Sequence, residues 1–176
     1  MKHIVVAAAA AAVLAALAGP RLSAQDYDKK TIDKMLADGT KKLGSPSADE
    51  RETGAGYILG YIRCSDRPKF VPILTKALQD PNPKVRKTVV QTFEKLQAAE
   101  AIPALVPLLM DPDSDVAERA AYTLGGLGAA AKSAIPDLQK AQAAYKAKKK
   151  SMLEMTMQEG IDEINGKSDG KRYSCP

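Results

Sequence analysis

The chain has 176 residues, of which 45% are hydrophobic and 27% charged, and its formal net charge is +5. This composition excludes a disordered chain, while 12 glycines, 11 prolines and two cysteines exclude collagen-like and disulfide-dense proteins. The only histidine is His3. We expect its segment to be removed, so histidine-based catalytic triads and histidine-ligated metals or haem are excluded from the mature protein.

Residues 1–24 follow the order of a secretory signal peptide, with Lys2 at the start and an uncharged apolar run over 4–17. The run is shorter than the roughly 20 residues that a membrane span needs, and the alternatives are a buried helix or a retained anchor. We expect cleavage after Ala24, or otherwise after Ala18. The mature chain would be periplasmic or secreted, without a stable membrane span. Its 24 basic and 21 acidic side chains give too small a net charge to favour nucleic-acid binding.

Residues 25–46 are expected to form an N-terminal capping helix. The segment 28–43 is amphipathic, with apolar positions at Ile32, Met35, Leu36 and Leu43. Ser47 followed by Glu50 three residues later is typical of a capping box, which would open the first of the repeated units described next.

A motif of a β-branched residue, proline, any residue and leucine occurs three times, at 71–74, 102–105 and 135–138. An Asp-Pro pair occurs twice, at 80–81 and 111–112. Each copy predicts two helices, because apolar residues recur at offsets 0, 4, 8 and 11 and then at 0, 3 and 7. The sequence therefore predicts an all-α chain of about three helix pairs, with boundaries at 47–79, 80–110 and 111–141.

Prolines mark the second helix of each pair. Pro72 and Pro103 are expected near the helix start, where the missing N–H is not needed. Pro107 lies one turn further in and should kink its helix.

These copies resemble the HEAT repeat, in the short form found in phycobilisome-lyase-type HEAT-like proteins, over about residues 48–141. The Val85-Arg86 pair is typical of the family, whose arginine bonds along the turns between helices, and repeat three has Val116-Ala117 instead. The resemblance implies a short α-solenoid with a right-handed superhelical twist and a concave face built from the second helices. Such stacks bury the faces that one helix pair leaves open, and their ends need caps.

The C-terminal region has two open interpretations. Residues 136–165 contain no further proline after Pro136 and form one long helix or two, so that 142–165 is a helical extension and 166–176 a flexible tail. Ser151 and Glu154 would form a capping box if a second helix begins there.

Seven lysines are the candidate partner-binding residues: Lys69, Lys76, Lys140, Lys146, Lys148, Lys149 and Lys150. They predict a docking patch for another exported protein on the second-helix face. The run over 140–150 would also suit a lipid head group or a cell-envelope polymer. The alternative is a solvated helix face with cations that suit a helix C-terminus.

No catalytic residue, cofactor or metal site is expected. Asp80, Asp111, Asp113 and Asp115 could serve acid–base chemistry, but aspartate at a helix entrance is the usual N-cap. Met152, Met155 and Met157 could form a Cu(I) site, yet Met157 fits a core stripe better. The leading hypothesis is thus a non-enzymatic scaffold of the bacterial envelope; the alternative is an accessory subunit of an enzyme or copper-handling system.

Cys64 and Cys175 are the only cysteines, and in an oxidising compartment we expect them to be joined. One continuous helix over 136–165 would carry the chain about 45 Å away from Cys64. A disulfide therefore requires the helix to bend or to fold back, and we expect a fold-back near Ser151. The alternative is two free or intermolecular thiols.

Overall fold

The computed structural model describes residues 28–167, and within this range it contains α-helices and short 3-10 helices but no strand. The α-helices are α2 (Lys29–Leu43), α3 (Ala48–Tyr61), α4 (Arg67–Ala77), α5 (Pro83–Leu96), α6 (Ile102–Leu105), α7 (Ser114–Gly126), α8 (Ile135–Ala147) and α9 (Ser151–Ile164). The 3-10 helices are η2 (Cys64–Asp66), η3 (Ala99–Ala101), η4 (Val106–Met110) and η5 (Gly128–Ala134). The predicted all-α solenoid is confirmed. The expected signal peptide at 1–24, Cys175 and most of the expected tail lie outside the described residues.

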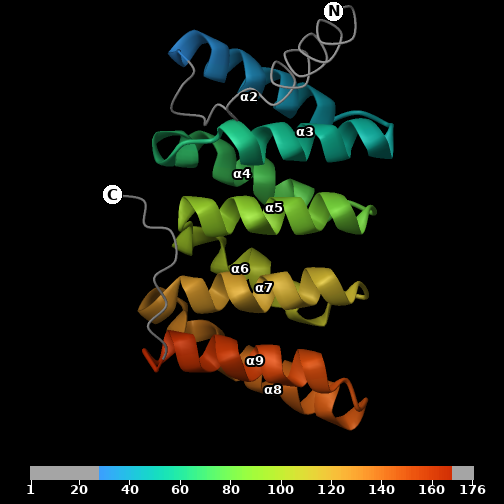
Figure 1. Cartoon of the computed structure of the whole chain (residues 1–176), viewed down its shortest axis with the longest axis vertical. Coiled ribbons are helices and arrows are strands. Elements are labelled where there is room, and N and C mark those ends of the chain that lie inside the picture. The colour runs from blue at the N-terminus through green and yellow to red at the C-terminus, as the bar shows by residue number, and fades with distance from the viewer. Residues whose placement is uncertain (1–27, 168–176) are drawn as a thin grey trace, which may run out of the picture.

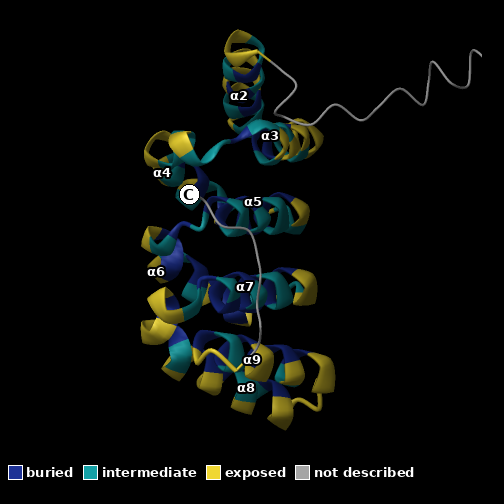
Figure 2. Cartoon of the chain, turned by 60° about the vertical axis from the view of Figure 1, so that its left-hand side comes forward, coloured by how far each residue is buried: buried dark blue, intermediate teal, exposed yellow. Residues whose placement is uncertain are grey.

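The helices form two layers. The first helices α3, α5, α7 and α9 stack on one another, as Figure 1 shows. The second helices form the other layer: α4 and α6 lie at the left of Figure 2, and α8, which contacts η4, lies below α9. Helix α2 packs on α3 at one end of the stack. Each pair is therefore covered by its neighbours, as a solenoid requires.

The predicted apolar stripes form the core between the layers. In α5 the stripe is Val85, Val89, Phe93 and Leu96, and each of these side chains is fully buried. The corresponding stripe of α7 ends at Leu127, which is 9% exposed. The spacing of the apolar residues in the sequence thus correctly predicts which face of each helix is buried.

Proline shapes the second layer, in part against expectation. Pro103 lies in the first turn of α6, and the helix changes to the 3-10 form of η4 at Val106, just before Pro107. The kink predicted at Pro107 corresponds to this change from α-helix to 3-10 helix. The placement of Pro72 near a helix start is wrong, because α4 begins at Arg67, with Pro68 in its first turn, and Pro72 lies inside it.

The C-terminal region is two helices, α8 and α9, and the residue boundary expected at 141 falls inside α8. Lys149 has a φ of 55°, a left-handed conformation usually taken by glycine. The Lys150 N–H donates to the Tyr145 carbonyl over 2.9 Å and the Lys149 N–H to the Lys146 carbonyl over 3.0 Å. These two bonds form a Schellman motif, which ends α8 and reverses the chain.

The two expected capping boxes have different outcomes. Ser47 is the N-cap of α3, and its hydroxyl accepts from the Glu50 N–H over 3.4 Å. The Glu50 carboxylate instead accepts from the Ser45 hydroxyl. The capping box at Ser151 is wrong, because Ser151 is already the first residue of α9 and the N-cap is Lys150, which makes no side-chain cap bond.

Glycines allow close contacts at both ends of the stack. A Cβ at Gly54 of α3 would lie 2.6 Å from the Gly39 carbonyl oxygen of α2. A Cβ at Gly160 of α9 would lie 3.1 Å from the Ala121 carbonyl oxygen of α7. The terminal helices thus approach their neighbours at backbone-to-backbone distance. A Cβ would clash at Gly54, whereas at Gly160 it would only require the neighbour to shift slightly.

Candidate functional site: the second-helix face

Arginine–aspartate pairs connect successive repeats at the turns that precede the first helices. Arg51 Nε donates to Asp80 Oδ2 over 2.6 Å, and Arg86 Nε donates to Asp111 Oδ2 over 2.8 Å. Each arginine also makes a second bond to the same carboxylate through Nη2. Both pairs are bidentate and nearly buried, with side-chain exposure of 14% and 7% in the first and 10% and 4% in the second.

The remaining guanidinium nitrogens satisfy turn carbonyls. Arg51 Nη1 donates to the Ser45 and Pro46 carbonyls, and Arg86 Nη1 donates to the Asp80 and Pro81 carbonyls. Each arginine therefore fixes its own turn and, through the aspartate, the next one. The corresponding position in α7 is Ala117, which is fully buried, so the series ends there.

Asp80 and Asp111 have a structural role, because each is held by an arginine and by a backbone N–H. Burial alone would raise the pKa of Asp80, but hydrogen bonds from Arg51 and the Asn82 N–H, with the charges of Arg51 and Arg86, hold this pKa below its ordinary value. The expected N-cap role is confirmed for Asp113, which caps α7. Asp80 and Asp111 are not N-caps: they accept from the backbone N–H two residues on, at Asn82 and Asp113.

Arginines and candidate lysines differ in their pairing. Within residues 28–167 every arginine forms an ion pair with a carboxylate, namely Arg51, Arg63, Arg67, Arg86 and Arg119. The seven candidate lysines are all exposed. Among the described residues only Lys146 of these seven has an acidic partner, Glu154 at 3.9 Å. Lys69 lies over the Phe70 ring, with its Nζ 5.5 Å from the ring centre. Arginine thus stabilises the fold through ion pairs, and six of the seven lysines have no acidic partner among the described residues.

The structure does not gather the seven lysines into one patch. Lys69 and Lys76 lie on α4, and Lys140 lies on α8. The α6–η4 segment lies between α4 and α8 in the second layer (Figure 2). Lys146 and the lysines of 148–150 are at the α8–α9 turn, at the edge of the stack away from the α3–α4 turn (Figure 1).

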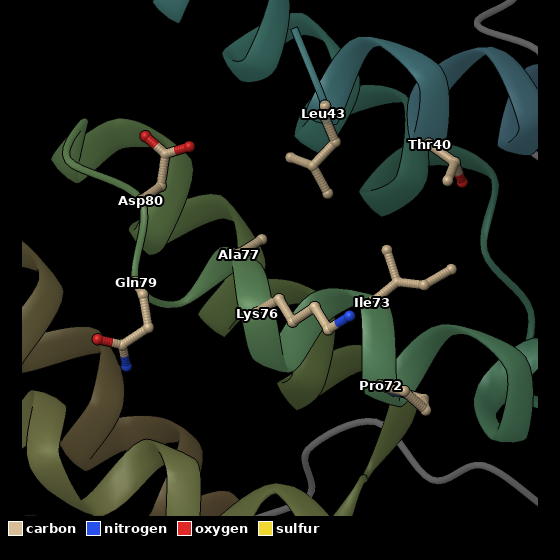
Figure 3. Close-up of a pocket in the computed structure, with 9 residues that line it drawn as sticks. Thr40, Leu43, Pro72, Ile73, Lys76, Ala77, Gln79 and Asp80 are labelled. Carbon is tan, nitrogen blue, oxygen red and sulfur yellow. The ribbon is translucent and has the colours of Figure 1, made fainter. Parts of the chain in front are cut away.

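A pocket of about 430 Å³ lies beside Lys76, between the end of α2 and the side of α4 (Figure 3). It exists because α2 has no second helix to cover that side of α4. Leu43 and Ile73 point toward each other across the pocket, and the Lys76 side chain extends into it (Figure 3). Asp80 also lines the pocket, but its carboxylate is paired with Arg51. The apolar wall beside the exposed Lys76 suits an apolar group next to a negative charge.

The structure does not bring together a methionine site. Met152 and Met155 of α9 are exposed by 68% and 58%, whereas Met157 is fully buried in the expected stripe with Leu153, Ile161 and Ile164. Within the described part of the chain, no group of three or more histidine, cysteine, aspartate or glutamate side chains could hold a metal ion. None of the described helices has the length and apolar content needed to cross a membrane.

Two features of the site were not predicted. Arg51 was missed, although it follows its N-cap by four residues, as Arg86 follows Asn82. Comparing the two copies from the N-cap onward would have identified it. The pocket was also missed, because it depends on α2 standing without a second helix.

Comparison with known proteins decides the family. A family model described as HEAT repeats matches residues 40–125 and 71–146, which together are more than half of the chain. The chain belongs to the HEAT-repeat family. This match does not confirm the phycobilisome-lyase type. A solved structure of an engineered protein is similar to this HEAT-repeat chain, with a TM-score of 0.53 and 20% identity over 74% of the chain and 62% of that protein.

The HEAT-repeat chain therefore spans less than two thirds of the length of that engineered protein. At this identity the likeness shows the fold alone. A comparison with curated proteins finds no match. HEAT repeats indicate a scaffold for protein interactions, which stacked helix pairs support through their extended surface.

Proposed function

We propose that this HEAT-repeat chain is a non-enzymatic, exported module that binds another exported protein through its second-helix face. One observation carries the proposal: the candidate lysines Lys69, Lys76 and Lys140 are exposed there without acidic partners in the part of the chain described. A set of uncompensated cations raises the rate and specificity of association with an acidic surface. Lys146, Lys148, Lys149 and Lys150 extend the candidate surface at the last turn.

The non-enzymatic part of the proposal rests on how the acidic residues are used. Asp80 and Asp111 are held by arginine and by backbone amides. A general acid or base must reach a substrate proton, and neither carboxylate is available for that. Binding is the role that the exposed groups support.

Export is supported by the signal-like order of residues 1–24. Protein recovered from the host's periplasm or medium should begin at Gln25, or at Gly19 if cleavage follows Ala18. N-terminal sequencing measures this directly. Intact Met1 in cytoplasmic protein would contradict the proposed compartment.

A disulfide between Cys64 and Cys175 is supported by the reversal after α8. The first helices run in the same direction, so the end of α9 and the α3–α4 turn with Cys64 lie at the same edge (Figure 1). Three interhelix steps of 8–10 Å separate them by about 24–30 Å. The eight steps from Lys167 to Cys175 span at most about 26–29 Å, enough if the segment is extended. Non-reducing peptide mapping should recover the linked pair, and two alkylatable thiols would exclude it.

The test of binding is affinity capture from envelope extract with the mature chain and two charge-reversed variants. The first variant carries K69E, K76E and K140E, and the second carries K148E, K149E and K150E. Equal melting temperatures of all three proteins make the comparison one of surface charge. A partner captured by wild type should be lost from the first variant. The same proteins captured by both variants and wild type would contradict the proposed surface.

A further inference from the structure

The repeats place chemically different residues at equivalent positions of the second helices. Aligning the three motifs from their shared leucine puts Lys76 of α4, Pro107 of η4 and Lys140 of α8 in one row across the layer. All three residues are exposed. Equivalent positions of stacked repeats are neighbours in space, so this row has a cation at each end and a proline in the middle.

The middle of this face is apolar because of the central repeat. Residues 101–110 contain no charged side chain. Pro103, Pro107 and Met110 are its exposed members, and Met110 is 45% exposed. An exposed apolar strip bordered by charge is typical of a surface that meets a partner.

The spacing of the two cations suits an extended chain. Neighbouring helices pack about 10 Å apart, so Lys76 and Lys140 are separated by about 20 Å. An extended segment advances about 3.3 Å per residue, and about six residues cover that distance. Asp137 is the exposed carboxylate of α8 on this face, and no ion pair joins it to Lys140 in the described chain.

We infer that the second-helix face binds an extended protein segment with two acidic side chains about six residues apart and apolar residues between them. This inference rests on the proposed function and specifies its partner. One carboxylate pairs with Lys76, the other with Lys140, and the apolar centre covers Pro103, Pro107 and Met110. The segment lies across the three second helices.

The pocket beside Lys76 extends the proposed binding site beyond Lys76. It opens on the side of α4 that faces α2 and is walled by Leu43, Ile73 and Ala77. A segment that continues past the carboxylate at Lys76 reaches it. We assign it to an apolar side chain placed one or two residues outside that acidic residue.

The probe is a fluorescein-labelled decapeptide with two glutamates six positions apart, a leucine–proline–leucine centre and a leucine outside the first glutamate. Fluorescence anisotropy measures its binding to the mature chain. Replacing both glutamates by glutamine should weaken binding at least tenfold. The K76E/K140E double variant should weaken it by a similar factor. The matched K30E/K34E variant, which reverses two exposed lysines of α2, should weaken it by less than twofold. A peptide with lysines in place of glutamates should bind the K76E/K140E variant better than wild type.

The results of the peptide and capture experiments separate the inferred acidic segment from the proposed function. Equal binding of the glutamate and glutamine peptides, or an equal effect of the two double variants, overturns the inference. If envelope capture still depends on Lys69, Lys76 and Lys140 while no glutamate peptide binds, the segment is wrong and the proposed function stands. If capture is also independent of these lysines, the proposed function is wrong as well.

Discussion

Gly54 and Gly56 are two glycines in the same helix, α3, that should respond in opposite ways to replacement by alanine. A Cβ at Gly54 would lie 2.6 Å from both the Gly39 carbonyl oxygen and the Leu43 nitrogen of α2. At Gly56 no heavy atom lies within 4 Å of the added Cβ. Gly54→Ala therefore tests the contact between α2 and α3, and Gly56→Ala is its matched control.

The magnitudes follow from two opposing effects. Alanine in place of glycine in a helix interior stabilises by about 0.5–1 kcal/mol, and Gly56→Ala should show this gain. At Gly54 the backbone of α2 would have to move by about 0.8 Å to restore a contact of 3.4 Å. Overpacking of this kind costs about 1–3 kcal/mol. The free energy of unfolding of Gly54→Ala should lie about 1–3 kcal/mol below that of Gly56→Ala.

Urea denaturation followed by circular dichroism measures both variants, and equal slopes against urea concentration show that the same surface unfolds. Hydrogen exchange of the α2 amides locates the effect. In Gly54→Ala, exchange should accelerate first in α2, which carries the buried Ile32 and Leu36. If Gly54→Ala is as stable as Gly56→Ala, the close α2–α3 contact does not hold the cap.

Four further variants, of which Lys87→Ala is a control, test the turns. Arg86→Ala should lower the free energy of unfolding by about 3–5 kcal/mol because it leaves the Asp111 carboxylate, 4% exposed, without its partner. Lys87→Ala removes one partner of an exposed ion pair and should change the free energy of unfolding by less than about 1 kcal/mol. Equal losses of stability for the two variants in urea denaturation would contradict the structural role of the buried arginine–aspartate pairs. The pKa of Asp80 is lowered by folding, so its ionised form stabilises the protein above its unfolded pKa of about 4, and this contribution is lost as the pH falls through the folded pKa. The stability difference between wild type and Asp80→Asn should therefore shrink between pH 7 and pH 3, and a constant difference would refute the assignment. Lys149→Gly should increase the free energy of unfolding by up to about 1 kcal/mol, and raise the melting temperature accordingly, because glycine adopts the left-handed conformation of this residue without steric strain. A lower melting temperature would show that the turn needs the lysine side chain.

The repeats could be predicted because their signals are local. Buried apolar residues recur at helical spacing, as in Val85 and Val89. The proline motif of the second helices recurs after 31 and then 33 residues. Pro107 interrupts its helix because proline has no backbone N–H to donate and its ring clashes with the preceding turn. Pro72 was misplaced because Pro68, four residues earlier, is the residue that lies in the first turn of α4.

The remaining features depend on contacts between distant residues. Lys149 ends α8 in a conformation that sequence patterns associate with glycine. The sequence therefore left one helix or two open, although α9 does begin at Ser151. In the sequence, Gly39 and Gly54 are residues of low helix propensity within two predicted helices. Their role, which is to allow the close contact between α2 and α3, follows only from the packing of these two helices. Likewise, Lys140 and the lysines at 146–150 lie close together in the sequence, but Lys140 lies within α8 and the lysines of 148–150 lie at the α8–α9 turn.

The central claim is that a partner occupies the second-helix face, and site-specific photocrosslinking in intact cells tests it directly. A photoreactive amino acid at Met110, 45% exposed on η4, should form a crosslink to another exported protein, and charge reversal at Lys76 and Lys140 should abolish it. The matched position is Thr53, exposed on α3 in the other layer, which should give no such product. Crosslinks from Thr53 with none from Met110 would place the partner on the first helices and contradict the account.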